Sequence, residues 1–399
     1  MKNKWTKFRH KVTRFIAYPI AKFLIKKKTG IKLRKFKGTK GPYVILYNHQ
    51  TGYDQFALSL CFKFPIYHVA SDDIFTLGFA SKLVNYCFSP IPIKKNVSDI
   101  GCVRTCIKVI KEGGTVVLAP EGNRTFSGET CYFNPAIVGM VKLLKTPVII
   151  FKIEGGYNAL PRWADKKRKG NANAYVSTII SPQEIQDLSK EELLERLKKE
   201  LYNNDYDMQE NFVGNNKAEY LERVAYVCPN CGLSEFESDK NLIRCKKCDL
   251  TVEYQEDKSL KVLKGNFAFN NYLEWYNYQN EFINKLDLLN QKQTLFYEDS
   301  ARILKVVPCK RRVLLQKNSQ IKLYGDRITA TVGGIEKQFA FEDLLGVSVL
   351  GKNKLNVYVT SEEIYQIKGS ERFNAVKYLN FYHRYLNQVK QDGSEFLGL

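Results

Sequence analysis

The stretch "YNHQTGYDQF", residues 47–56, places a histidine five positions before an aspartate, His49 and Asp54. The apolar segment "PYVILYN" (42–48) predicts a buried strand, and "DQFALSLCF" predicts a helix that begins at Asp54. A strand-to-helix turn of this length can bring the two side chains together. The carboxylate then holds one ring nitrogen, and the other nitrogen can act as a base. Taken alone, the pair is weak evidence, because this spacing often arises by chance.

The surrounding segments alternate between strand and helix patterns. "TVVLAPEG" and "PVIIFKIEGG" are apolar and β-branched, as in the strands of a covered sheet. "VSDIGCVRTCIKVIKEGG" has helical periodicity and ends at a pair of glycines. This alternation predicts an α/β domain over residues 30–215. We expect one charged helix over "SPQEIQDLSKEELLERLKKELYNN" (181–204) to close it.

A second polar stretch, "LAPEGNRTFSG" (118–128), follows the end of a predicted strand. Gly122 allows close backbone approach, and the planar fork of Arg124 suits a phosphate group. Glu121 could hold that arginine or accept a hydrogen bond from a substrate. By itself this stretch would be an ordinary turn with a surface arginine.

The N-terminus is strongly basic. The chain has a net charge of +21, and 15 Lys and Arg lie among its first forty residues, with no acid before Asp54. Apolar side chains recur there at helical spacing: Phe8, Val12, Phe15, Ile16, Ile20, Phe23 and Leu24. No run reaches the roughly 20 apolar residues that span a bilayer. We predict that residues 1–29 are an interfacial anchor for an anionic membrane, with Pro19 kinking the helix or starting a second one. The alternative is a helix packed on the body of the protein.

The chain has 10 Cys, of which six are scattered through apolar segments, as expected in a reducing cytosol. The other four form two C-x2-C pairs with thirteen residues between them: Cys228, Cys231, Cys245 and Cys248. This spacing predicts a zinc ribbon over residues 216–262. Four thiolates fill the coordination sphere, so the zinc would be structural. The alternative, four incidental cysteines, is disfavoured by the paired spacing.

Residues 263–399 begin with a helical stretch and then change to short strands separated by Gly, Asn and Asp turns. The predicted strands are "QIKLYG", "RITATV", "KQFAFEDL", "GVSVLG", "KLNVYVT" and "IYQIKG", and "SERFNAVKYLNFYHRYLNQ" predicts a terminal helix. An antiparallel sheet closed by a C-terminal helix resembles the pleckstrin-homology-like architecture. Such a domain could contact a membrane or a partner, or serve as a scaffold.

Together, "NHQTGYD" and "PEGNRTFSG" resemble the glycerolipid acyltransferase family, in particular the 1-acyl-glycerol-3-phosphate O-acyltransferases. The matching family motifs are NH-x4-D and PEG-x-R-S/T. "IPIKK" is similar to the family's second motif, but Lys94 and Lys95 replace its acid and arginine. "TPVIIFKI" is similar to the fourth motif. The resemblance covers about residues 30–200, half of the chain.

This resemblance implies acyl transfer from acyl-CoA or acyl carrier protein to the hydroxyl of a lysophosphatidic acid-like acceptor, in phospholipid biosynthesis. His49 would deprotonate the hydroxyl and Asp54 would orient His49. The remaining motif residues would bind the acceptor, chiefly its phosphate: Lys95, Glu121, Gly122 and Arg124. Lysine gives no bidentate grip, so the acceptor headgroup stays open. The chemistry needs no metal or bound cofactor.

Two other classes of function compete with this one. A basic arm and a zinc ribbon are also typical of a nucleic-acid-binding protein. Binding to nucleic acid, however, does not require the apolar stripe. This function also leaves both motifs unexplained. A lipid-binding scaffold with an inactive transferase domain is disfavoured by the intact His49 and Asp54 pair. We therefore expect a peripheral enzyme at the cytoplasmic face of the cell membrane, with no nucleic acid partner.

Overall fold

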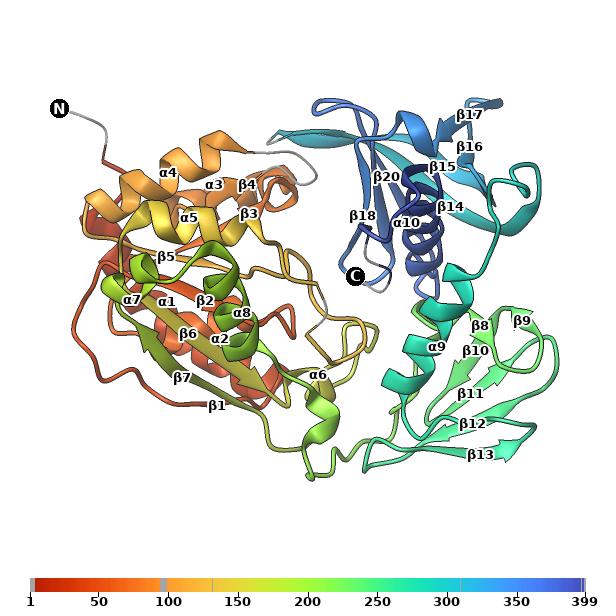
Figure 1. Ribbon diagram of the computed structural model, residues 1–399, viewed down its shortest axis with the longest axis horizontal. Helices are drawn as coiled ribbons and strands as arrows, with labels where there is room; N and C mark the ends of the chain where they lie inside the picture. The colour runs from red at the N-terminus through yellow and green to blue at the C-terminus, as the bar shows by residue number, and fades with distance from the viewer. Residues whose placement is uncertain (1–3, 94–98, 131, 309, 396, 398–399) are drawn as a thin grey trace. The chain divides into compact units, whose positions relative to one another are not determined.

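The computed structural model describes residues 4–93, 99–130, 132–308, 310–395 and 397. The chain divides into two compact units, which we call the first and the second unit. The first unit comprises residues 1–161 and 167–212, and the second comprises residues 162–166 and 213–399. Figure 1 shows the helices and strands of both.

The first unit is built on a seven-stranded sheet in the order β1-β7-β6-β2-β5-β3-β4. β6 and β7 are antiparallel, and the other neighbours are parallel. The strands are β1 (Lys32–Leu33), β2 (Val44–Tyr47), β3 (Ile66–Ser71), β4 (Ile91–Ile93), β5 (Thr115–Leu118), β6 (Val148–Glu154) and β7 (Asn173–Ile180). The predicted α/β domain is confirmed.

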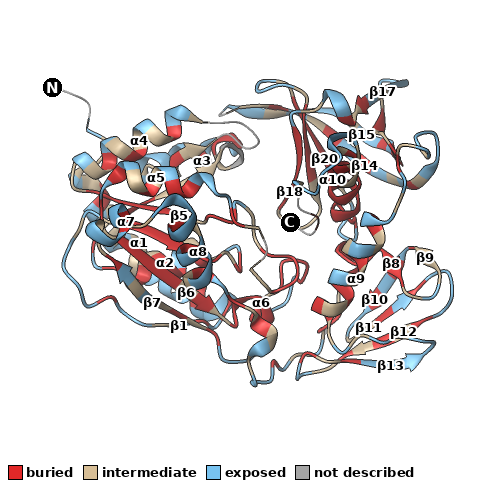
Figure 2. Ribbon diagram, viewed as in Figure 1, coloured by how far each residue is buried: buried red, intermediate tan, exposed pale blue. Residues whose placement is uncertain are grey.

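Helices cover both faces of this sheet, as expected for parallel strands. They are α1 (Phe8–Lys28), α2 (Asp54–Cys61), α3 (Phe79–Phe88), α4 (Ile100–Lys111), α5 (Ala136–Leu144), α6 (Gly156–Ala159), α7 (Pro182–Asp187) and α8 (Lys190–Leu201). β2 is buried throughout (Figure 2). Its Ile45 and Tyr47 pack with α1 and α2, and its Val44 and Leu46 pack with α4, α5, α7 and α8.

The expected single helix over residues 181–204 is instead two helices, α7 and α8. Ser181 and Ser189 each accept a hydrogen bond from the backbone N–H of a glutamate three residues later, and the carboxylate of that glutamate accepts a hydrogen bond from the serine N–H. Each capping box supplies hydrogen-bond acceptors to backbone N–H groups that have no acceptor within the helix. The second serine therefore starts a new helix where periodicity alone predicted continuation.

α1 is one helix that contains Pro19, so the proline does not start a second helix. The helix packs on α2 and α3 and buries His10 and Ile25. Its predicted apolar stripe is turned outward: Phe8, Val12, Phe15, Ile16, Ile20 and Phe23 are 43–79% exposed, and Leu24 is half-buried. Among the residues that the structure describes, no helix is both long enough and apolar enough to cross a bilayer.

The second unit contains three antiparallel sheets, in the orders β8-β9, β10-β11-β12-β13 and β17-β16-β15-β14-β20-β19-β18. The first two are formed by β8 (Val227–Cys228), β9 (Gly232–Leu233), β10 (Phe236–Asp239), β11 (Leu242–Cys245), β12 (Thr251–Tyr254) and β13 (Leu260–Lys264). The third is formed by β14 (Leu295–Val307), β15 (Arg311–Tyr324), β16 (Arg327–Val332), β17 (Ile335–Ala340), β18 (Gly346–Leu350), β19 (Lys354–Tyr358) and β20 (Ile364–Gly369).

Two helices complete the second unit, α9 (Tyr272–Asn284) and α10 (Val376–Lys390). The C-terminal antiparallel sheet and its terminal helix are thus present as predicted. The sequence analysis missed β14, which pairs with both β15 and β20 and holds the sheet together. Its sequence "LFYEDSARILKVV" mixes charged and apolar residues, and its register shifts against β15 interrupt the alternation that identifies a strand.

Candidate active site

His49 and Asp54 lie side by side at the carboxyl end of β2. His49 follows the strand and Asp54 is the first residue of α2. Nδ1 of His49 lies 2.8 Å from Oδ2 of Asp54. The histidine side chain is 21% exposed, whereas the aspartate side chain is fully buried. The imidazole is therefore accessible to a substrate while its carboxylate partner is shielded from water.

The turn between these two residues holds the Asp54 carboxylate in place. Oδ2 accepts hydrogen bonds from the backbone N–H groups of Gln50 (2.7 Å) and Thr51 (2.9 Å). Oδ1 accepts a bond of 2.6 Å from the Thr51 hydroxyl. Both oxygens of Asp54 therefore act as hydrogen-bond acceptors. His49 then donates from Nδ1, so Nε2 is the ring atom that can take a proton from a hydroxyl.

The loop after β5 forms hydrogen bonds with both the N–H and the carbonyl of His49. Oε1 of Glu121 accepts the His49 N–H at 2.6 Å, and the Thr125 N–H donates to the His49 carbonyl at 3.1 Å. Gly122 has a φ of +66°, a conformation that favours glycine, and it lets the chain turn between these two contacts. Glu121, expected to bind substrate, thus contacts the histidine backbone. Motifs 72 residues apart meet at this point.

Burial controls the charge of Glu121. The side chain is almost completely buried, and this burial raises the pKa of Glu121 to about 8. The hydrogen bond from His49 opposes the rise in pKa, and the Asp54 carboxylate adds to it. At neutral pH the Glu121 carboxyl is thus mostly protonated. A neutral carboxyl can still accept the His49 N–H without placing a second negative charge beside Asp54.

Arg124 packs against the turn that carries the histidine. A methyl group added at Gly52 would lie 3.2 Å from Nη1 of Arg124, closer than such contacts normally allow. Burial lowers the pKa of Arg124, and the nearby Asp54 carboxylate opposes this. Arginine ordinarily loses its proton only in strongly alkaline solution, so the guanidinium stays charged at any physiological pH. The site therefore places a cation next to the His49 and Asp54 pair.

Three residues that were not predicted from the sequence hold the segments around the site. Asn48 and Gln50 join the histidine loop to β6 and the segment after it, and Asp205 holds that segment. The Asn48 side-chain amide bonds both the N–H and the carbonyl of Ile153, at 2.8 and 2.7 Å. Oε1 of Gln50 accepts the Tyr157 N–H at 3.1 Å. Buried Asp205 accepts from the Gly155 N–H at 2.9 Å. Asn48 and Gln50 belong to the histidine motif and could have been noticed, but nothing in the sequence marks Asp205.

Lys95, the expected second cation for the phosphate, lies outside the described residues, as does Lys94. β4 ends at Ile93, directly before them. The site is therefore defined by the loop after β2 and the loop after β5.

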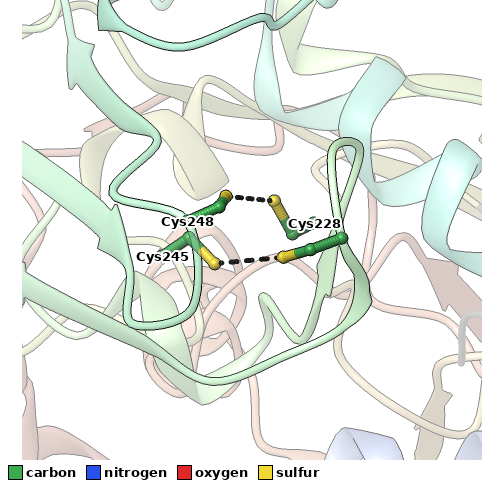
Figure 3. A group of neighbouring side chains, drawn as sticks. Cys228, Cys245 and Cys248 are labelled. Atoms are coloured by element: carbon green, nitrogen blue, oxygen red, sulfur yellow. Dashed lines mark hydrogen bonds between the residues drawn. The ribbon is translucent and has the colours of Figure 1, made fainter.

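A different cluster in the second unit could hold a metal ion. The Sγ atoms of the four paired cysteines all lie within 4.8 Å of one another. Cys228 and Cys248 are 3.5 Å apart, and Cys231 and Cys245 are 3.6 Å apart (Figure 3). A tetrahedral zinc with Zn–S bonds of about 2.3 Å separates its sulfurs by about 3.8 Å, so the four thiols fit such an ion.

Comparisons with known proteins support the assignment of the first unit. Residues 26–153 match the family model described as Acyltransferase. A search of curated proteins found no match. The solved structures that match include the 1-acyl-sn-glycerophosphate (LPA) acyltransferase, PlsC, from Thermotoga maritima, with 17% identity, a TM-score of 0.38, and coverage of 48% of this chain and 76% of that chain. The family match contains both motifs and confirms the resemblance, and residues 26–153 match an acyltransferase domain.

Proposed function

We propose that the protein transfers an acyl group from acyl-CoA or acyl carrier protein to the hydroxyl of a lysophosphatidic acid-like acceptor, in phospholipid biosynthesis. The observation that carries the proposal is the contact of 2.8 Å between Nδ1 of His49 and buried Asp54, inside the family match. His49 is the proposed base, and Asp54 fixes its tautomer.

In the proposed reaction, Nε2 of His49 removes the proton from the acceptor hydroxyl as its oxygen attacks the thioester carbonyl. A tetrahedral oxyanion forms, and Asp54 stabilises the imidazolium that His49 has become. The intermediate collapses with cleavage of the C–S bond. The thiolate leaves and takes the proton from His49, so the ester and a free thiol are the products.

Arg124 is the proposed contact for the acceptor phosphate. Its guanidinium is charged and packs on the turn that carries the base. A planar fork can hold two phosphate oxygens at once, which would place the acceptor hydroxyl in a fixed position. Lys95 remains the proposed second cation.

The function can be tested with purified full-length protein, labelled acyl-CoA or acyl carrier protein, and a panel of lysophospholipids. We expect labelled diacyl product from lysophosphatidic acid, and none from the His49→Ala variant. The variant Glu195→Gln, which changes a side chain that is 72% exposed on α8, serves as a folded control. Near-normal turnover by His49→Ala would contradict the mechanism, and transfer to no acceptor in the panel would contradict the substrate class.

We also propose that α1 binds the cytoplasmic face of the cell membrane as a peripheral anchor. The outward position of the stripe supports this, because a helix that only packed on the protein would bury its apolar side. Lys and Arg on the helix would attract anionic lipid, and that part of binding weakens in salt. Replacing Phe15, Ile16 and Phe23 by serine should weaken the salt-resistant part of liposome binding. Unchanged binding by this variant in high salt would refute the anchor.

For the second unit we propose a structural zinc on the four cysteines and a pleckstrin-homology-like domain after it. We retain the proposed division into residues 1–29, 30–215, 216–262 and 263–399. Support for the zinc comes from the sulfur separations and from Ser234, whose hydroxyl lies 3.1 Å from Sγ of Cys245. Support for the domain comes from the seven-strand order and the terminal helix α10.

A further inference from the structure

α3 exposes an apolar stripe of its own. Of its ten residues only Ser81 is buried. Phe79 is 80% exposed, Leu83 53% and Tyr86 58%, at the spacing that places them on one side of a helix. Leu77, just before the helix, is 52% exposed. Soluble proteins carry scattered apolar side chains on their surfaces. On α3, however, the large apolar side chains lie together, and no part of the described chain covers them.

The end of α3 that carries Tyr86 contacts α1. The guanidinium of Arg9 lies 4.3 Å from the centre of the Tyr86 ring and donates to the Tyr86 carbonyl at 3.0 Å. The Thr13 hydroxyl donates to the Cys87 carbonyl at 2.6 Å. The Trp5 indole donates to the Ser89 carbonyl at 3.0 Å. The end of α3 is thus fastened to the first half of α1 by polar contacts, while the apolar residues of both helices remain outside.

The two helices carry only positive formal charges, although Asp72 and Asp73 precede α3 in the chain and Glu112 accepts hydrogen bonds from Trp5 and Thr6 before α1. Residues 1–53 contain no Asp or Glu, and neither do residues 74–98, in which Lys82 lies on α3. A partner for this surface must therefore offer both an apolar layer and negative charge. A bilayer with anionic headgroups offers both, with aromatic and aliphatic side chains at the acyl boundary and cations at the headgroups.

We propose that α3 is a second lipid-inserting helix, which joins α1 in one face that binds the interface of an anionic phospholipid bilayer. This inference rests on the proposed membrane association and extends it to a segment between the two acyltransferase motifs. Leu77, Phe79 and Leu83 enter the acyl boundary. Tyr86 and Arg9 lie at the headgroup level, where an amphipathic ring and a cation are both accommodated.

Insertion can be measured directly with the variant Phe79→Trp in the full chain, bound to phosphatidylcholine–phosphatidylglycerol vesicles that contain dibrominated phosphatidylcholine. Bromine quenches indoles that enter the acyl region. We expect clear quenching beyond that of wild type, whose own three Trp supply the background. Leu143→Trp is the matched control, since Leu143 is 56% exposed on α5, which packs on the face of the sheet opposite α1.

Binding strength supplies the second readout. Phe79→Ser and Leu83→Ser should each weaken vesicle binding about tenfold in high salt, because burying one large apolar side chain is worth about that factor. Leu143→Ser should bind as wild type does. If the α1 triple variant loses binding but Phe79→Trp is not quenched, the role of α3 is refuted and the α1 anchor stands. If wild type does not bind vesicles, both proposals fail. If Phe79→Ser instead dissociates a dimer in sedimentation, a second copy covers this face and the inference is overturned.

Discussion

Replacing Glu121 by glutamine removes an ionisable group from beneath His49 and keeps an acceptor for the His49 N–H, which now lies 2.6 Å from Oε1. Burial raises the pKa of Glu121 from 4.5 to about 8 in the folded protein. A raised pKa means that folding favours the protonated carboxyl. The resulting stabilisation is complete below pH 4.5 and is lost as the pH rises towards 8. Glutamine resembles the protonated carboxyl at every pH. The variant should therefore keep this stabilisation of the folded state as the pH rises.

The size of the effect follows from the pKa difference. Each unit of pH between the two pKa values changes the free energy of unfolding by about 1.4 kcal/mol. Between pH 5.5 and pH 7.5, wild type should therefore lose about 2 to 3 kcal/mol relative to Glu121→Gln. Other titrating groups are common to both proteins and cancel in this comparison. Glu195→Gln is the control, because the Glu195 side chain is 72% exposed on α8.

Urea titrations at the two pH values would measure this difference, with hydrogen exchange of a peptide from β2 as the readout, so that the first unit is followed separately. The same variants should be assayed for acyl transfer at pH 7. If protonated Glu121 only positions His49, then Glu121→Gln should have near-normal kcat and KM. An unfolding difference that is equal at both pH values would show that Glu121 is ionised in the folded protein, and the reasoning would fail.

Three further predictions concern the site and the cysteine cluster. His49→Ala should lower kcat by about 10²–10⁴-fold and Asp54→Asn by a comparable factor in steady-state assays, with wild-type circular dichroism; a variant whose turnover is normal would exclude its residue from the mechanism. Gly52→Ala should displace the guanidinium of Arg124 by a few tenths of an ångström and raise KM for a phosphate-bearing acceptor up to about tenfold, with less change for monoacylglycerol; equal changes for both acceptors would contradict the phosphate contact. Cys245→Ser should abolish binding of about one zinc per chain in elemental analysis while acyl transfer persists, and a wild-type protein purified without chelator that contains no zinc would contradict the ribbon.

Local sequence determined the elements that carry the candidate base. An apolar strand followed within a few residues by a helix start brings His49 and Asp54 within reach of each other, and the 2.8 Å contact shows that they meet. The alternation of strands and helices likewise sufficed to predict the α/β domain, because a covered parallel sheet requires apolar strands. The paired cysteines could be recognised for the same local reason, since each C-x2-C turn orients two thiols together.

Tertiary structure decided which contacts form between segments that are distant in the sequence. Neither motif shows by itself that Glu121 accepts the His49 N–H, that Arg124 packs on Gly52, or that Asp205 anchors the loop after β6. These contacts arise because β2, β5 and β6 are neighbours in the sheet, an order that the chain sequence does not state.

The same limit applies to the surface and to the second unit. Periodicity identified an apolar stripe on α1, but only packing shows which side of the helix faces the protein. On that side His10 is buried and contacts the Tyr67 hydroxyl. β14 was not predicted because its apolar and polar residues do not alternate regularly. This strand pairs on both sides and has register shifts against β15. Local pattern thus determines which element forms, whereas the partners of each side chain depend on the three-dimensional order of the elements.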